Sequence, residues 1–199
     1  MNIVIIDTGC ANLTSIQVAI KRIGYTSVIT SNIDLILKAQ KIFLPGVGNA
    51  ATVMKILHKK NLINTIKNLK HPTLGICLGM QIFCDFSEEC IGTKTIGIFK
   101  NCSAHLLKTT NFPLPHIGWN NISFDDSQPL FKNINKNSRF YFVHSYIIPL
   151  NKYTLATSNY EVSFSAVMQK KNFFGVQFHP EKSGSVGAQL LKNFLEMQL

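Results

Sequence analysis

The first half of the chain alternates short apolar runs with segments that carry apolar residues at helical spacing, and this alternation limits the possible folds most strongly. Apolar runs that predict strands lie at residues 2–7, 25–30, 41–44 and 73–77. Helical spacing covers residues 13–23, 50–69 with a break near Lys60 and Asn61, and 79–86. Strands and helices that alternate at such intervals form a parallel sheet with helices on both faces. We therefore expect an α/β fold.

The second half follows a different pattern. After Gly92, short β-rich segments separated by turns lie at residues 95–99, 104–107, 121–124, 140–143, 154–158, 163–169 and 173–177, and a last helical segment covers 184–197. No linker or repeat divides the 199 residues, a length that fits one domain. The sequence thus predicts a single domain over residues 1–199: an open, mostly parallel central sheet with helices on both faces and an antiparallel β-rich extension.

Charge and hydropathy narrow the class of protein. The chain has 20 Lys and Arg residues against 10 Asp and Glu residues, a net charge of +10. The basic residues are scattered and show no aromatic-interleaved RNA motif, which argues against nucleic acid as a partner. The charge then marks either a solvated surface or a basic docking face. Because no apolar run approaches the roughly 18 residues of a membrane span and no basic leader precedes residue 7, we expect a cytoplasmic protein without membrane contact.

The cysteines give no sign of disulfides or of a metal. There are five of them, an odd number without the spacing of a disulfide framework, so we expect reduced thiols. No Cys-x-x-Cys pair is present, and the sequence His179-Pro180-Glu181 is not followed by the cysteines of a zinc deaminase. The sequence therefore predicts neither a metal site nor a bound cofactor.

Cys77 has the strongest local signal for chemistry. A buried strand runs into Gly75-Ile76-Cys77-Leu78-Gly79 and then into a helix, the arrangement of a nucleophile elbow with sulfur in place of oxygen. The helix N-terminus behind Cys77 favours the thiolate, which is the reactive form. The alternative is a small buried residue, the usual state of a free cysteine. Four other cysteines lack this setting and are interpreted as packing residues, namely Cys10, Cys84, Cys90 and Cys102.

A base and its orienting group follow a second apolar strand. His179 comes directly after residues 173–178, and Glu181 stands two positions later. If extended geometry continues, that spacing places Glu181 on the same side as His179. A cysteine nucleophile needs such a base, and the base needs an acidic partner that fixes its tautomer. We therefore expect Cys77, His179 and Glu181 to form a catalytic triad.

The segment Gly46-Val47-Gly48-Asn49-Ala50-Ala51 matches Gly-x-Gly-x-x-Ala, the dinucleotide fingerprint. Such a site requires an acidic residue about 20 positions later. None lies between Asp34 and Asp85, so nucleotide binding is not expected. A glycine-rich turn beside the elbow instead brings backbone N–H groups toward an oxyanion.

The chain resembles the class I, triad-type glutamine amidotransferases through three segments: Pro45-Gly46-Val47-Gly48, Gly75-Ile76-Cys77-Leu78-Gly79-Met80-Gln81 and Phe178-His179-Pro180-Glu181. Further segments make it similar to the glutaminase subunits of imidazole glycerol phosphate synthases: Asp7-Thr8-Gly9-Cys10-Ala11-Asn12-Leu13, His116-Ile117-Gly118-Trp119-Asn120 and Tyr141-Phe142-Val143-His144-Ser145-Tyr146. The resemblance runs from end to end with the motifs in family order.

The resemblance implies roles for individual residues. Cys77 attacks glutamine and forms a thioester, while His179 carries the proton to ammonia. Backbone N–H groups of Leu78 and of the turn at Gly46 and Val47 hold the oxyanion. The family pattern also implies that the glutamine is positioned by Gln81, Ser145 and Tyr146, although Ser145 and Tyr146 could be ordinary polar residues at a strand end.

The resemblance further implies a partner, a cyclase subunit with a (β/α)8-barrel fold that forms a heterodimer with this chain and receives ammonia through a protected channel. Its products are imidazole glycerol phosphate and an aminoimidazole carboxamide ribotide, made from a phosphorylated ribulosyl precursor in histidine biosynthesis. Trp119 then lies near the subunit interface, or else it is a buried core residue. Two alternatives stay open: a glutaminase subunit of another amidotransferase pathway, and a non-catalytic binding module of the same fold.

Overall fold

The computed structural model describes residues 1–9 and 13–198, and within these residues the largest element is an eight-stranded sheet. The strand order is β2-β1-β3-β4-β14-β13-β12-β9. The first five strands in this order are parallel, and the last three are antiparallel to their neighbours. This confirms the predicted mostly parallel sheet with an antiparallel extension. The bounds are β1 Ile3–Ile6, β2 Ser27–Thr30, β3 Lys41–Gly46, β4 Thr73–Cys77, β9 Ser123–Phe124, β12 Thr154–Tyr160, β13 Val162–Lys170 and β14 Phe173–Val176.

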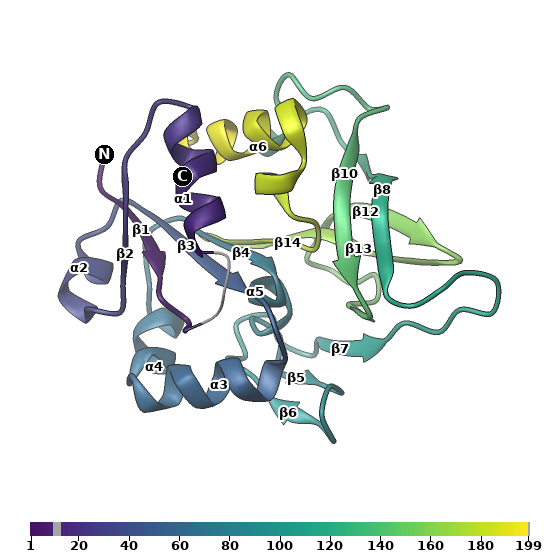
Figure 1. Ribbon diagram of the computed structural model, residues 1–199, viewed down its shortest axis with the longest axis horizontal. Helices are drawn as coiled ribbons and strands as arrows, with labels where there is room; N and C mark the ends of the chain where they lie inside the picture. Colours follow the sequence, from purple (N-terminus) through teal and green to yellow (C-terminus); the bar gives the residue numbers. More distant parts are fainter. Residues whose placement is uncertain (10–12, 199) are drawn as a thin grey trace.

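Helices cover both faces of the parallel half of the sheet, as predicted (Figure 1). α1 (Leu13–Arg22) and α6 (Gly184–Glu196) lie on one face, and α3 (Ala50–Lys59) and α4 (Leu62–Lys67) lie on the other. Each helix buries one apolar stripe against the strands, so that the core forms two layers, one on either side of the sheet. The predicted break between α3 and α4 is confirmed at Asn61, whose φ of 55° lies in the left-handed region.

Three predicted elements differ from the structure. The helix expected over 79–86 is shorter, because α5 (Leu78–Gln81) ends where Ile82, Phe83 and Cys84 accept backbone hydrogen bonds from residues 96–99. The strand expected at 95–99 is wrong for the same reason, since its N–H groups bond to this turn. The strand expected at 121–124 is divided between the end of β8 (His116–Asn121) and β9. A short helix, α2 (Ile33–Leu37), was not predicted, and the side chain of Asn32 caps it.

Two smaller sheets stand beside the carboxyl ends of the parallel strands. One contains β8 (His116–Asn121) and β10 (Arg139–His144), which are antiparallel. The other has the order β11-β7-β5-β6, with bounds β5 Phe86–Ser87, β6 Thr93–Lys94, β7 Ser103–Leu106 and β11 Tyr146–Ile147. Short 3-10 turns cover Pro129–Phe131 and Pro180–Lys182. Figure 1 shows β8 and β10 standing apart from the helical layers, next to the strands β12 and β13.

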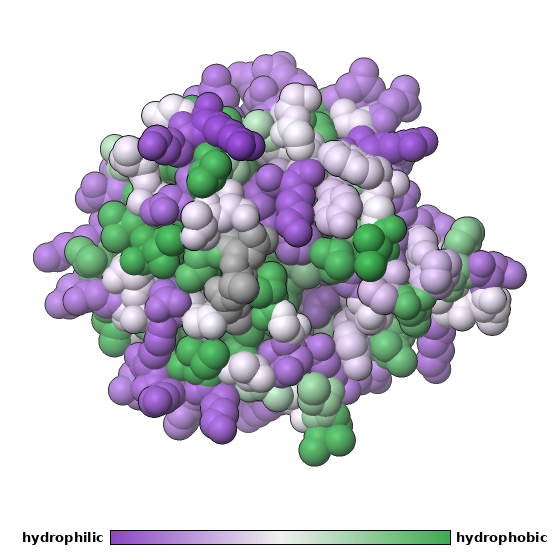
Figure 2. Space-filling model, viewed as in Figure 1, coloured by the Kyte–Doolittle hydropathy of each residue, from purple (hydrophilic) through white to green (hydrophobic). Residues whose placement is uncertain are grey.

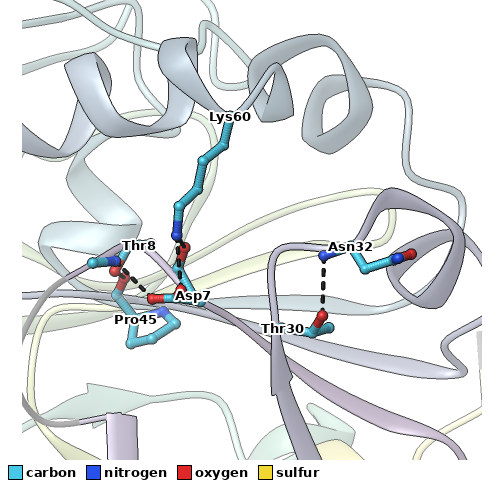
Figure 3. A network of polar contacts seen from close by, with 7 residues as sticks. Asp7, Thr8, Thr30, Asn32, Pro45 and Lys60 are labelled. Atoms are coloured by element: carbon cyan, nitrogen blue, oxygen red, sulfur yellow. Dashed lines mark hydrogen bonds and ion pairs between the residues drawn. The ribbon is translucent and has the colours of Figure 1, made fainter.

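Polar contacts join the loop after β1 to the end of β3 and to Lys60, which follows α3 (Figure 3). Lys60 Nζ donates to the backbone oxygen of Asp7 and, at 2.7 Å, to its carboxylate, and this hydrogen bond lowers the pKa of Asp7. The hydroxyl of Thr8 donates to the carbonyl oxygen of Pro45. These contacts hold the loop after β1 against the carboxyl end of β3, at the edge of the sheet where open α/β folds place their sites.

Candidate active site

Cys77 lies at the junction of β4 and α5 with a strained backbone, at φ 55° and ψ −112°. Positive φ is uncommon for residues other than glycine and persists only where the surrounding structure enforces it. Close packing supplies that enforcement: a Cβ on Gly79 would lie 1.9 Å from the carbonyl oxygen of Leu44, so only glycine fits beneath the turn. The sharp turn predicted from the Gly-x-Cys-x-Gly pattern is therefore present, and the Cys77 side chain lines a cavity with 8% of the residue exposed.

His179 and Glu181 lie beside Cys77, after the end of β14. His179 Nδ1 is 2.8 Å from Glu181 Oε1, and both side chains are almost fully buried. The extended geometry expected between them is wrong, because residues 180–182 form a 3-10 turn, which nevertheless brings the carboxylate to the ring. The backbone N–H of His179 donates to Tyr141, and Ser183 Oγ donates to the carbonyl oxygen of His179. These bonds fix the residue from both sides.

The pKa of His179 is set by its burial and by two neighbouring groups. Burial lowers the pKa of the ring, whereas hydrogen bonds with Cys77 and Glu181 and the charges of both raise it more strongly, to a net value of about 10. Since Nδ1 bonds to Glu181, the other ring nitrogen, Nε2, is left for Cys77. The geometry thus suits a histidine that holds a proton next to the sulfur.

The turn after β3 approaches Cys77 from the neighbouring strand. Gly46 is the register partner of Cys77, and β3 extends through Gly46, two residues beyond the predicted strand. A Cβ on Gly46 would come within 2.6 Å of the backbone nitrogen of Gly79. Val47 follows directly, and Leu78 is the first residue of α5. The proposed oxyanion groups therefore come from two adjacent segments beside the sulfur.

A cavity of about 240 Å³ opens at Cys77. The elbow side contributes Cys77, Leu78 and Gln81, and Ser145 and Tyr146 form another wall; the remaining lining residues are Gly48, Glu89, Pro115, Val143 and His144. A larger hollow of about 910 Å³ lies against residues 126–136, but it contains neither the cysteine nor the histidine of the predicted triad. We therefore assign the smaller cavity as the candidate active site, because Cys77 lines it.

Gln81 faces a buried amide network. Its Nε2 donates to the carbonyl oxygen of Tyr146 and to Gln177 Oε1, both at 2.9 Å. Gln177 Nε2 in turn lies 3.7 Å from Cys77 Sγ. Neither Gln177 nor Glu89 was predicted from the sequence. The carboxylate of Glu89 accepts a hydrogen bond of 2.6 Å from the backbone N–H of Ala50, the first residue of α3. A polar residue ending the apolar strand 173–177 was a signal for Gln177, and no local signal pointed to Glu89.

Trp119 is 52% exposed, so the alternative of a buried core tryptophan is wrong. It lies on the outward face of β8 and β10, a surface that we call the outer face and define by Ile117, Trp119, Tyr141 and Val143. The rings of Trp119 and Tyr141 meet edge to face, with centroids 6.0 Å apart. Val143 also lines the cavity, so the outer face adjoins the opening to Cys77.

The other cysteines have separate environments. Cys84 and Cys102 are buried with their sulfur atoms 3.2 Å apart, as expected of packing residues. The interpretation of Cys90 as a packing residue is wrong, because it is exposed at a turn with φ 52°. Cys10 lies outside the described residues.

Residues 1–9 and 13–198 contain neither a metal-binding cluster nor a membrane-spanning helix. No three His, Cys, Asp or Glu side chains in these ranges converge in a way that could hold a metal ion. In the same part of the chain, no helix has the length and apolar character that crossing a membrane requires.

Comparisons with known proteins identify the family of this chain. The family model for glutamine amidotransferase class-I matches residues 4–197. The imidazole glycerol phosphate synthase subunit HisH of Buchnera aphidicola subsp. Schizaphis graminum is 72% identical, over 99% of this chain and 100% of that protein. The subunit HisH of Salmonella typhimurium is 51% identical with the same coverage.

Solved structures support the fold. A glutamine amidotransferase crystal structure superposes with a TM-score of 0.74 at 13% identity, covering 97% of each chain. A glutamine amidotransferase from Thermotoga maritima gives a TM-score of 0.63 at 19% identity, covering 98% of this chain and 81% of that one. The chain therefore belongs to the class-I glutamine amidotransferases and, within them, to the imidazole glycerol phosphate synthase subunits HisH.

Proposed function

We propose that this chain is a cytoplasmic glutaminase, a single glutamine amidotransferase domain over residues 1–199, which supplies ammonia within imidazole glycerol phosphate synthase in histidine biosynthesis. One observation carries the chemical part of the proposal: a strained cysteine in the wall of a small cavity is hydrogen-bonded to a buried histidine, which is itself held by a buried carboxylate. This is the arrangement that activates a sulfur nucleophile.

In the proposed reaction, Cys77 Sγ attacks the side-chain amide carbon of glutamine. His179 holds the thiol proton as imidazolium and passes it to the departing ammonia, which leaves a thioester. Water then hydrolyses the thioester to glutamate and returns a proton to the sulfur. Glu181 accepts from Nδ1 of His179, and this bond fixes the ring and stabilises its positive charge.

The oxyanion of each tetrahedral intermediate is held by backbone N–H groups of Leu78 and of the turn at Gly46 and Val47. Removing one such donor costs about 100- to 1000-fold in rate. The cavity of about 240 Å³ suits an amino acid rather than a nucleotide. Gln81, Ser145 and Tyr146 are proposed to position the glutamine, a role supported by their presence in the cavity wall.

The outer face supports a docking role for Trp119. Four neighbouring side chains present apolar and aromatic surface next to the cavity opening, and Lys182 lies over the Tyr141 ring at 5.7 Å. Figure 2 shows green and pale residues, rather than deep purple ones, over β8 and β10 in the right half of the view. Exposed apolar patches of this kind mark interaction sites. The proposed occupant is the (β/α)8-barrel cyclase subunit, which forms a heterodimer with this chain and receives ammonia through a protected channel.

The experiment measures glutamate released from glutamine by the purified chain, alone and with the cyclase subunit and its phosphorylated ribulosyl ligand. We expect strong release in the full mixture, and none after Cys77→Ala, whereas Cys90→Ser leaves the rate unchanged. Release that ignores the cyclase would assign the chain to another amidotransferase pathway. No release under any condition would indicate a non-catalytic binding module.

The docking role is tested with the matched pair Trp119→Ala and Leu35→Ala. Both residues are about half exposed, but Leu35 lies on α2, away from the outer face. We expect Trp119→Ala to weaken stimulation by the cyclase and Leu35→Ala to leave it intact. Equal stimulation of both variants would contradict the assigned interface.

A further inference from the structure

Two histidines lie buried at one end of an aromatic layer, and the mechanism above uses neither. His116 and His144 are register partners on β8 and β10, with 3% and 6% exposure. His116 stacks on Tyr160 and Phe142, at centroid distances of 4.0 and 5.1 Å. The other inward positions of β10 are the buried Phe140 and Phe142. The layer thus changes from phenylalanine to histidine only where it reaches the cavity, although a phenylalanine would bury no polar atoms there.

The hydrogen bonds of this pair have one consistent direction. His144 Nδ1 lies 3.0 Å from the carbonyl oxygen of Tyr146, which can only accept, so Nδ1 carries the hydrogen. In a neutral ring, His144 Nε2 is then an acceptor, and its partner at 3.0 Å, His116 Nδ1, must donate. Burial lowers the pKa of both rings, to about 4 for His116 and about 3 for His144, which agrees with two neutral imidazoles.

This bonded series ends at the nucleophile. The carbonyl oxygen of Tyr146 accepts from His144 and also from Gln81 Nε2. Gln81 donates its other amide hydrogen to Gln177, whose own amide faces Cys77 Sγ. Ser145 and Tyr146 form the cavity wall between these groups. The histidine pair therefore holds the carbonyl group of Tyr146 from one side. This carbonyl group is part of the cavity wall, and it also accepts the hydrogen bond from Gln81.

We propose that His116 and His144 are positioning residues, a neutral hydrogen-bonded pair that holds the Ser145 and Tyr146 wall and Gln81 in place for glutamine binding at Cys77. The inference rests on the proposed glutamine hydrolysis, which it deepens. Because the pair touches the cavity wall rather than the sulfur, its loss raises the KM for glutamine more than it lowers kcat.

Two substitutions of His116 separate hydrogen bonding from packing. Asparagine carries a donor nitrogen where the imidazole has Nδ1, so His116→Asn keeps the bond to His144 but loses the stack. His116→Phe keeps the stack but leaves His144 without its donor. In the full chain assembled with the cyclase subunit, we expect KM to rise about 3- to 10-fold in His116→Phe, the effect of one hydrogen bond, and by less than about 2-fold in His116→Asn, with kcat similar in both.

The opposite ranking, with His116→Asn impaired and His116→Phe normal, would overturn the proposal, because packing would then be the role of the residue. A fall in kcat at unchanged KM would also overturn it. If the wild-type protein does not hydrolyse glutamine, and if a glutamine chloroketone does not alkylate Cys77, the proposed function itself fails. This inference then fails with it.

A second measurement uses only the wild-type chain, so it does not require that a variant folds. NMR of 15N-histidine in the wild-type chain reports the tautomer of each ring. Both His116 and His144 are expected as Nδ1–H tautomers at pH 7, and an Nε2–H tautomer of His144 would overturn the proposal.

Discussion

Two buried histidine sites, His179 and the pair of His116 and His144, lie near the Cys77 cavity and have opposite electrostatics. At His179, hydrogen bonds with Cys77 and Glu181 outweigh burial and raise the pKa to about 10. At the pair of His116 and His144, burial acts without a carboxylate and lowers the pKa of both rings, to about 4 and about 3. The partners, and not the depth of burial, decide whether a histidine holds a proton or a fixed hydrogen bond.

The difference in pKa between the two sites follows from the hydrogen-bond partner that each histidine has. His179 finds its carboxylate two residues away, after a strand end that also faces Cys77. His116 finds only another imidazole, 28 residues away on the adjacent strand, and beyond it a backbone carbonyl. A histidine paired with a carboxylate beside a cysteine is suited to proton transfer, whereas a neutral imidazole pair is suited to holding its neighbours by fixed hydrogen bonds.

Removing the ring of His179 gives the largest expected effect. His179→Gln should lower kcat/KM for glutamine by about 10 000-fold or more, because no group then receives the Cys77 proton. His116→Asn, its matched control at the second site, should stay within about 2-fold of wild type. Similar losses in the two variants, measured as glutamate release from the assembled enzyme, would break the comparison.

Glu181→Gln is expected to have the next largest effect. The amide keeps a polar contact with Nδ1 but removes the charge that raises the pKa of His179, so that the imidazolium is less stable. We expect kcat/KM to fall about 1000-fold. Steady-state kinetics at several pH values test this expectation, and a loss below about 10-fold would mean that Glu181 only packs against the ring.

Much of the site, but not its surroundings, was predictable from sequence. The elbow at Cys77 depends on glycines within two positions, and Glu181 is two positions from His179, so local patterns carried both. The pairing of Gln81 with Gln177 spans 96 residues, and Glu89 reaches Ala50 across 39. Such contacts depend on strand order, which short-range patterns do not contain. The exposure of Trp119 likewise depends on which face of β8 packs inward.

The smallest expected effect is on stability in acid. Unfolded histidine has a pKa near 6.5, whereas the folded pair stays neutral down to about pH 4. The unfolded chain therefore binds more protons as the pH falls below about 6.5. The stability that the neutral pair contributes is complete above that pH, and it is lost as the pH falls toward the folded values.

Each histidine of the pair should reduce the free energy of unfolding by about 1 kcal/mol or less per pH unit between about pH 6 and pH 4. Denaturant titrations of wild type and His116→Phe should differ in this dependence by the contribution of one histidine. Identical pH dependence in the two proteins would mean that His116 is already charged in the folded state.

The most direct test of the account is a pH titration of the histidine rings by NMR in the folded wild-type chain. We expect His179 to remain an imidazolium at pH 8 and to titrate near pH 10, while His116 and His144 remain neutral at pH 5. A neutral His179 at pH 8, or a charged His144 at pH 5, would contradict the claim that the hydrogen-bond partners decide which histidine carries a proton and which stays neutral.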